Sequence, residues 1–443
     1  MTRSSIKSTH MEVITMTQTM PSNSQAKSDN ESLLAETLSV YDFLAGISQL
    51  SILGVVETTA LVEAIHREIV LRPIGLLNHK YGDFWRHSIS SRVYGMVRGI
   101  TLLVGQGLAF AMHKSNHFLG PKTKQPLPNS LHQLVDVLNG VMGDHLENKK
   151  NPLALPMMLY SSEGQPIAKS NRASQTQVLS GKVVIILHGL CMGYVNWQPT
   201  NEQGLGQRIA KAQPETSVLY LNYNTGRRIS TNGREFSALL QQLTVAHPDI
   251  SEITLIGHSM GGLVSRSALY YGEQAQQPWV KKTKKLITLG TPHHGAVLER
   301  IGNTVQQTIS KLPFAGSLGK LGDIRSTGII DLRHGSIRDE DWQSLATRSV
   351  LPDSERHFTP LPEHIAAYFL AASLSEEGDT SKVNYLLGDG LVNIHSALGE
   401  HIGDHSLDVP EEHKAVFYGI GHLALLSDKR VLDQTINWLQ EPL

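Results

Sequence analysis

The pattern of apolar and polar positions changes near residue 181, and this change divides the chain. Downstream, short apolar runs typical of strands alternate with stretches in which apolar residues recur at helical spacing. The predicted strands are Lys182–Leu187, Ser217–Asn222, Glu252–Ile256, Lys285–Leu289, Lys382–Leu387 and His413–Tyr418. The predicted helices are Glu235–Val245, Gly262–Tyr271 and Leu425–Leu439. This alternation predicts an α/β fold, in which a mostly parallel sheet carries helices on both faces.

Two further apolar runs, Leu155–Tyr160 and Pro166–Ser170, predict an antiparallel start of the sheet. Between Gly295 and Lys382 no run has a clear strand pattern, so residues 296–381 are predicted to form an insertion. Apolar residues three or four apart in residues 297–312, ended by Pro313, predict an amphipathic helix there. The insertion is therefore expected to resemble a lid.

Upstream of residue 151 the pattern is helical, with apolar residues at helical spacing in Leu33–Val70 and Leu131–Leu146. Residues 33–150 are predicted to form a helical N-terminal region, and residues 151–443 the α/β domain. Residues 1–32 are rich in polar residues and are expected to be a disordered tail. Because this stretch lacks the apolar core of a secretory signal, the expected compartment is the cytoplasm.

Composition narrows the function without identifying it. Of the 443 residues, 40% are apolar and 18% charged, which is enough apolar sequence for a sizeable core. The 39 basic and 40 acidic residues give a net charge of −1, which argues against a nucleic-acid-binding protein. The single cysteine excludes an intramolecular disulfide and a thiolate-cluster metal site. The oligomeric state stays open.

The near-neutral total hides one basic segment. Residues 72–124 hold eight Lys or Arg but only one acidic residue, Asp83, and contain the most apolar window, Val93–Met112. Arg98 argues against a membrane-spanning helix, because a charge near the centre of a span costs about 2.5–3.5 kcal/mol. Two interpretations remain: a buried helical hairpin with solvated basic ends, or peripheral contact with anionic lipid on the inner face of the membrane.

The candidate chemistry begins at Gly257-His258-Ser259-Met260-Gly261-Gly262, between an apolar run and a helical pattern. The pattern G-x-S-x-G in this setting is the nucleophile elbow of the α/β-hydrolase fold, a sharp turn that exposes the serine hydroxyl. Small residues at positions 257 and 261 allow neighbouring chain to pass close to the turn. Ser259 is therefore the predicted nucleophile; the alternative is a structural turn serine.

The loop after Lys182–Leu187 reads His188-Gly189-Leu190-Cys191, and here the α/β-hydrolase fold places an oxyanion donor. The backbone N–H groups of Leu190 and Met260 are the predicted oxyanion hole. His188 is expected to brace the loop. Cys191 is expected to be a packing residue, because a thiol there lacks the elbow.

The acid and the base should follow the serine in the order Asp or Glu, then His. Asp389 is the preferred acid because it follows a predicted strand in Gly388-Asp389-Gly390, and His422 is the preferred base because it follows another in Gly421-His422. The rival residues are Asp379, Asp404 and Asp408 for the acid, and His401, His405 and His413 for the base.

Two other pairs of polar residues are candidates for ligand binding. Adjacent histidines at a strand end point in opposite directions, so His293 and His294 are expected to brace a loop rather than bind a metal. Arg227 and Arg228 follow a strand and would meet an anionic head group or, in the alternative interpretation, play a structural role.

These motifs together resemble the bacterial esterase/lipase branch of the α/β-hydrolases, related to GPI inositol-deacylase and to triacylglycerol lipases. The narrower part of the resemblance is Leu289-Gly290-Thr291-Pro292-His293-His294-Gly295. It covers about residues 155–443 and implies hydrolysis of small-molecule or lipid esters without a cofactor. Residues 33–150 have no counterpart in those lipases.

Three functions are compatible with this reading of the sequence. The leading one is a serine hydrolase that cleaves carboxylic, and in particular lipid, esters through an acyl-enzyme. An acyltransferase or thioesterase would use the same triad, since water exclusion and pocket shape decide the acceptor. A membrane-associated binding protein without activity would be expected to lack a triad residue, and all three positions are filled.

Overall fold

A computed structural model shows how the predicted strands and helices are arranged. The described residues are 38–39, 42–43, 45–47, 127, 129–167, 179–198, 203–296, 326–343, 357–377, 388–401 and 404–442. Several predictions fall outside them: the tail 1–32, nearly all of the helix 33–70, the basic segment 72–124, the helix 297–312 and the strand 382–387. These stay predictions.

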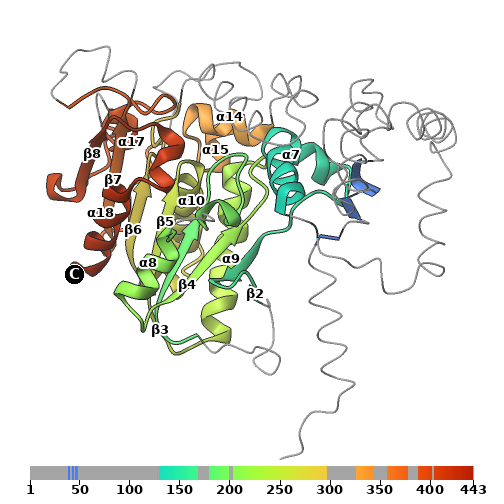
Figure 1. The fold of residues 1–443 in the computed structure, drawn as a ribbon, viewed down its shortest axis with the longest axis horizontal. Coiled ribbons are helices and arrows are strands. Elements are labelled where there is room, and N and C mark those ends of the chain that lie inside the picture. Colours follow the sequence, from blue (N-terminus) through green and yellow to red (C-terminus); the bar gives the residue numbers. More distant parts are fainter. Residues whose placement is uncertain are drawn as a thin grey trace, which may run out of the picture. The chain divides into compact units, whose positions relative to one another are not determined.

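The centre of the fold is an eight-stranded sheet in the order β2-β1-β4-β3-β5-β6-β7-β8 (Figure 1). Its strands are β1 (Met158–Ser161), β2 (Pro166–Ile167), β3 (Gly181–Leu187), β4 (Ser217–Asn222), β5 (Ile250–His258), β6 (Thr283–Leu289), β7 (Ala366–Ser373) and β8 (Lys414–Tyr418). The strands from β4 to β8 in this order pair in parallel, and β1 pairs antiparallel with both β2 and β4. The predicted parallel sheet with an antiparallel start is confirmed.

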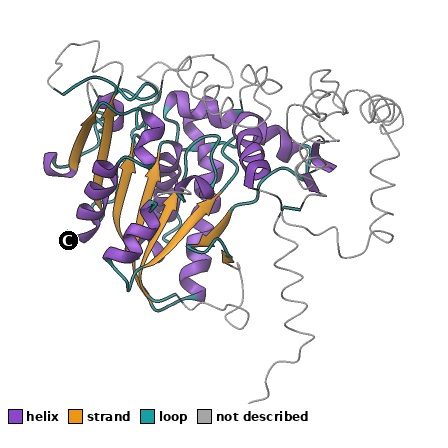
Figure 2. Cartoon of the chain, viewed as in Figure 1, coloured by secondary structure: helices purple, strands orange, loops and turns teal. Residues whose placement is uncertain are grey.

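Helices cover both faces of this sheet (Figure 2). They are α7 (Asn129–Asn148), α8 (Leu205–Ala212), α9 (Ile229–Ala246), α10 (Met260–Gln274), α11 (Trp279–Lys282), α14 (Thr327–His334), α15 (Asp339–Gln343), α17 (Ile394–Ala397) and α18 (Lys429–Gln440), with short 3-10 helices η3 (Tyr194–Trp197), η7 (Glu411–His413) and η8 (His422–Leu426). The predicted helices at 235–245, 262–271 and 425–439 correspond to α9, α10, and η8 with α18.

The two faces follow from the two-residue period of a strand. In β3, Val183 and Ile185 pack in one core together with residues of α7, α9 and α10. Val184 and Ile186 pack in a second core together with residues of α8 and α18. Because both sets are apolar, the strand reads as one continuous hydrophobic run, which is typical of a parallel strand buried on both sides.

One sequence prediction is wrong. The segment 296–381 was expected to contain no strand, yet β7 (Ala366–Ser373) lies inside it, between β6 and β8. Four of the eight residues of β7 are alanine, and alanine is depleted in strands, so the run carries no recognisable strand signal. The strand forms because nearly all of it is buried in the sheet. The chain therefore returns to the sheet well before residue 381.

Helix α7 belongs to the same core as the sheet. Its apolar residues Leu134, Leu138 and Val141 are buried in the cluster that contains β3 and β5 side chains. A domain boundary at residue 150 therefore does not separate α7 from the α/β body, because the described residues of both lie in one unit. Among the described residues, no helix combines the length and apolar character needed to cross a bilayer.

Candidate active site

Ser259 stands at the sharp turn between β5 and α10, as the elbow motif predicts. Its backbone has φ 52° and ψ −121°, a conformation that costs energy for any residue with a Cβ. The turn is tied to the neighbouring strand, because the Ser259 N–H donates to the Leu289 carbonyl (2.9 Å) and the Thr291 hydroxyl donates to the Ser259 carbonyl (3.0 Å). The side chain of Ser259 is 2% exposed.

The glycines on either side of Ser259 are required by close backbone contacts. A Cβ on residue 257 would lie 2.4 Å from the Gly262 nitrogen, and a Cβ on residue 261 would lie 2.7 Å from the Leu187 carbonyl oxygen. Any larger side chain would push the helix away from the strands. The small residues of the motif therefore fix the position of the serine above the sheet.

The loop after β3 runs beside Ser259, where a Cβ on Gly189 would be 3.1 Å from the Ser259 Cβ. Leu190 follows directly, and Met260 is the first residue of α10, so both predicted oxyanion residues adjoin the serine in sequence or space. His188 is fully buried, contacts the Gly189 carbonyl through Nδ1 (3.0 Å) and stacks on Tyr223. Burial lowers the pKa of His188 to about 4, against weaker opposing hydrogen bonds.

Cys191 is buried in the same loop, and burial raises the pKa of its thiol, so it stays protonated. Its N–H donates to Thr225 Oγ1 (3.2 Å), and its Sγ lies 3.9 Å from the Val137 carbonyl of α7. A buried neutral thiol with these contacts is a packing group rather than a nucleophile.

Asp389 and His422 form a direct pair, with Asp389 Oδ2 and His422 Nδ1 2.7 Å apart. The other carboxylate oxygen accepts N–H groups from Leu391 (2.9 Å) and Val392 (2.8 Å), so both oxygens of the buried carboxylate are used. Because an ionised carboxylate only accepts, Nδ1 of His422 must carry the proton. The buried Nε2 is then a lone-pair acceptor, and within the described residues it has no hydrogen-bond partner.

Gly290 brings this pair next to the serine. It follows Leu289, whose carbonyl accepts the Ser259 N–H, and its own Cβ would lie 3.1 Å from Asp389 Oδ2 and 3.3 Å from His422 Cε1. All three residues predicted as a triad therefore surround the end of β6. The rival His413 contacts the Ala367 carbonyl at the N-terminal end of β7, which is the opposite end of the parallel strands from Ser259.

His258 is a site residue that the sequence analysis did not single out. It is fully buried, its Nε2 lies 3.1 Å from the His422 carbonyl, and the two rings are 4.8 Å apart. Burial and then the nearby His422 hold the pKa of His258 well below its usual range, so the ring is neutral. His258 therefore positions the loop that carries His422. Its only sequence signal is its place beside the serine.

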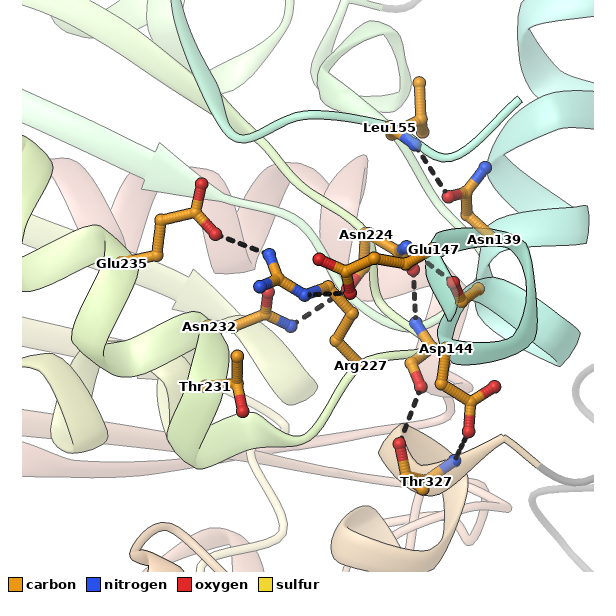
Figure 3. Close-up of polar contacts among 12 residues, drawn as sticks. Asn139, Asp144, Glu147, Leu155, Asn224, Arg227, Thr231, Asn232, Glu235 and Thr327 are labelled. Atoms are coloured by element: carbon orange, nitrogen blue, oxygen red, sulfur yellow. Dashed lines mark hydrogen bonds and ion pairs between the residues drawn. The ribbon is translucent and has the colours of Figure 1, made fainter. Parts of the chain in front are cut away.

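The two arginines after β4 are paired with carboxylates, as the structural interpretation predicts. Arg227 contacts Glu147 of α7 through Nε (2.7 Å) and also Glu235 of α9 (Figure 3), and Arg228 pairs with the fully buried Asp331. The guanidinium groups thus connect α7, α9 and α14 rather than presenting charge to a ligand.

His293 and His294 diverge, as expected for adjacent residues. His293 is buried, stacks on Phe369 and contacts Thr288 Oγ1 through Nε2 (3.2 Å), whereas His294 faces His401 with ring centroids 4.9 Å apart. In the part of the chain that the structure describes, no three His, Cys, Asp or Glu side chains are grouped to hold a metal ion.

Comparison with known proteins agrees with this architecture. Residues 178–370 match the family model of the PGAP1-like alpha/beta domain. The match spans β3 to β7 and includes the elbow, and it supports the α/β-hydrolase fold that the sheet order and the serine turn display. No curated protein matches the sequence.

Several solved structures are similar to this chain. The mature lipase BlEst2 of Bacillus licheniformis is 16% identical, with a TM-score of 0.38, over 58% of this chain and 91% of that one. A gene product of Listeria innocua is 16% identical, with a TM-score of 0.34, over 60% and 96%. Lipase B of Aspergillus fumigatus is 13% identical, with a TM-score of 0.33, over 59% and 53%.

Proposed function

We propose that the chain is a serine hydrolase of the esterase and lipase branch of the α/β-hydrolases and that it cleaves carboxylic esters through an acyl-enzyme. The match of residues 178–370 to the PGAP1-like alpha/beta domain supports this proposal. The observation that carries the proposal is the buried pair of Asp389 and His422, which adjoins the strained turn of Ser259 at the end of β6. Strain at a non-glycine residue is kept only where the surrounding structure enforces it, and such residues cluster at active sites.

The chemistry follows from the proton positions. His422 Nε2 accepts the proton of the Ser259 hydroxyl as its oxygen attacks the ester carbonyl, and the backbone N–H groups of Leu190 and Met260 donate to the resulting oxyanion. Nε2 then returns the proton to the alcohol that leaves. Water, activated by the same nitrogen, attacks the acyl-enzyme and releases the acid. Throughout, Asp389 stabilises the imidazolium and holds its tautomer.

The proposed substrates are small-molecule or lipid esters, and the reaction uses no cofactor. The proposal of lipid esters as substrates rests on the resemblance of the sequence to lipases and on the apolar, basic segment 72–124. For this segment we propose peripheral contact with an anionic membrane on its cytoplasmic side. This membrane contact is separate from the hydrolysis and is tested separately, by sedimentation of the full chain with anionic and with neutral vesicles.

A fluorophosphonate probe tests the nucleophile. Such probes form a covalent bond to an activated serine, so the wild-type chain should be labelled and Ser259→Ala should not. Ser265→Ala is the matched control, because Ser265 lies in the same helix and its hydroxyl donates only to the Gly261 carbonyl (2.9 Å). Undiminished labelling of Ser259→Ala would overturn the proposal.

A series of p-nitrophenyl esters of graded acyl length tests the substrate class. A maximum of kcat/KM at long acyl chains supports lipid esters, because each buried methylene adds about 0.8 kcal/mol of binding. A maximum at acetate or butyrate restricts the proposal to small esters. Hydrolysis of none of them by a protein that the probe still labels would contradict ester cleavage.

A further inference from the structure

The turn directly after β7 anchors the loop that carries the acid. Strand β7 ends at Ser373, and the acid loop lies beside this end at Gly388, the residue before Asp389. The Leu374 N–H fixes this arrangement because it donates to the Gly388 carbonyl (2.8 Å). The position of the carboxylate therefore depends on the turn after β7.

The same turn anchors the loop that carries the base. The Ser373 carbonyl accepts the Ile420 N–H (3.1 Å), and the Ser375 carbonyl accepts the Gly419 N–H (2.9 Å). The turn itself is closed by a hydrogen bond between the hydroxyls of Ser373, which is fully buried, and Ser375 (2.6 Å). The acid loop and the base loop thus share one anchor.

The side chain of Leu374 also joins the two loops. A Cβ on Gly390, the residue after Asp389, would lie 3.2 Å from Leu374 Cδ1. A Cβ on Gly421, the residue before His422, would lie 3.3 Å from Leu374 Cδ2. Each methyl group of the leucine therefore rests on the backbone of one loop, and the absence of a side chain at both glycines allows this approach.

Burial in the core does not account for the place of Leu374. Its side chain is 55% exposed, although Asp389 and His422 beneath it are buried. A leucine that stays half in water contributes little hydrophobic stabilisation. Its contact with the two loops is therefore its main structural role, and these loops carry the acid and the base.

We propose that Leu374 is a positioning residue for the pair of Asp389 and His422. Its two methyl groups hold the acid loop against the base loop. Two hydrogen bonds join the loops that Leu374 spans: the His422 N–H donates to the Asp389 carbonyl (3.0 Å), and Nδ1 lies 2.7 Å from Oδ2. The effect of this positioning on catalysis rests on the proposed function.

A shift of one loop against the other changes the distance between Oδ2 and Nδ1 directly. The second carboxylate oxygen, Asp389 Oδ1, is held inside its own loop by the N–H groups of Leu391 and Val392, so the carboxylate moves with that loop. Catalytic groups are sensitive to such shifts, since a misplacement of about 1 Å can lower the rate about a hundredfold.

Steady-state kinetics with a p-nitrophenyl ester test the effect on catalysis. Leu374→Ala should lower kcat about tenfold and leave KM within about twofold, because the acid–base pair changes and the contacts to substrate do not. Leu374→Met should keep kcat within about threefold of wild type, since methionine has a similar volume and still reaches both loops. The melting temperature of Leu374→Ala should fall by no more than about 3 °C.

Val245→Ala is the matched control for Leu374→Ala and should keep wild-type kcat. Val245 is 69% exposed and lies in the last turn of α9, before β5, at the opposite end of the parallel strands. Wild-type kcat in Leu374→Ala would overturn the positioning role. A raised KM at unchanged kcat would also overturn it, because Leu374 would then contact the substrate.

Proton NMR of the full chain tests the geometry without a substrate. The Nδ1–H proton of His422 lies in a short hydrogen bond to a carboxylate and should resonate far downfield; loss of the signal in His422→Gln assigns it. This signal should move upfield or broaden in Leu374→Ala and persist in Leu374→Met and Val245→Ala. An unchanged signal in Leu374→Ala would contradict the proposal whether or not the chain cleaves esters. Failure of the proposed function has a different sign, a wild-type chain that the fluorophosphonate does not label.

Discussion

Gly140 of α7 lies directly against Cys191 of the loop after β3. A Cβ on residue 140 would stand 2.2 Å from the Cys191 Sγ and 2.8 Å from its backbone nitrogen. Cys191 itself has a positive φ of 59°, so the loop is held in a strained conformation by this contact and by its hydrogen bond to Thr225. Leu190, whose N–H is the proposed oxyanion donor, precedes it. The helix therefore supports the oxyanion loop.

Gly140→Ala should lower kcat by about tenfold to a hundredfold, because displacement of one oxyanion donor costs about that much or more. By helix propensity alone, Gly140→Ala would raise the stability of the protein, since alanine favours a helix interior by about 1 kcal/mol over glycine. The measurements are kcat and KM with a p-nitrophenyl ester, normalised to fluorophosphonate-titrated sites.

Gln133→Ala, at a half-buried position of the same helix, is the matched control for this prediction and should leave kcat unchanged. If Gly140→Ala lowers the melting temperature while kcat per titrated site stays at the wild-type value, α7 only packs against the loop and does not position it.

This contact also marks what the sequence could predict. The elbow at Ser259, the strands before it and the choice of Asp389 and His422 followed from local patterns, because each is a short run of residues with its own turn. The support of the oxyanion loop by α7 joins residues 51 apart, and close approach at Gly140 leaves no local signature. Strand β7 was missed for the same reason: burial in the sheet, rather than the propensity of its alanines, makes it a strand.

Asp136 of α7 should make stability depend on pH. Its carboxyl lies against Gly193, and burial raises its pKa from 3.8 to about 8. The folded state then binds a proton that the unfolded state releases, so the free energy of unfolding falls as pH rises from about 4 to about 8. Below about pH 4 the Asp136 carboxyl is protonated in both the folded and the unfolded state, so the free energy of unfolding no longer depends on its titration.

Asp136→Asn should therefore be more stable than wild type at about pH 8, by a margin at least about 1 kcal/mol larger than at about pH 5. Urea unfolding at both pH values measures this margin. Asp408→Asn, at an exposed position, should show no such change. A margin that is constant or grows toward acid pH would contradict the raised pKa of the buried Asp136 carboxyl.

Asn224 should matter more to stability than the ion pair beside it (Figure 3). Its Nδ2 donates to the Gly143 carbonyl (2.9 Å) and its Oδ1 accepts the Gly226 N–H (3.1 Å), and the side chain is 1% exposed. Asn224→Ala leaves both backbone groups buried without their partner, at a cost of about 2–4 kcal/mol in the free energy of unfolding.

Glu147→Ala is the comparison for Asn224→Ala. It removes the ion pair with Arg227, but 48% of the Glu147 side chain is exposed, so the loss should stay below about 1 kcal/mol. Urea unfolding of both variants measures the difference. Equal losses would mean that the charges, rather than the buried amide, hold α7 to the loop after β4.

Asp389→Asn should lower kcat by about three to four orders of magnitude while KM changes little. In the wild-type chain His422 Nδ1 lies 2.7 Å from Asp389 Oδ2. The asparagine side chain fits the same space, so its oxygen or its nitrogen still faces Nδ1. However, an amide neither stabilises the imidazolium nor enforces the Nδ1–H tautomer, because its NH₂ group can donate to Nδ1 and shift the proton to Nε2. Nε2 would then be unable to accept the Ser259 proton.

Steady-state kinetics measure the loss of kcat in Asp389→Asn. Asp404→Asn, at an exposed rival position, is the control and should keep wild-type kcat. The backbone N–H groups of Leu391 and Val392 donate to Asp389 Oδ1, and the asparagine oxygen can replace this acceptor in only one orientation of the amide. The melting temperature of Asp389→Asn should therefore fall modestly. Wild-type kcat in Asp389→Asn, or an equal loss in Asp404→Asn, would remove Asp389 from the proposed triad.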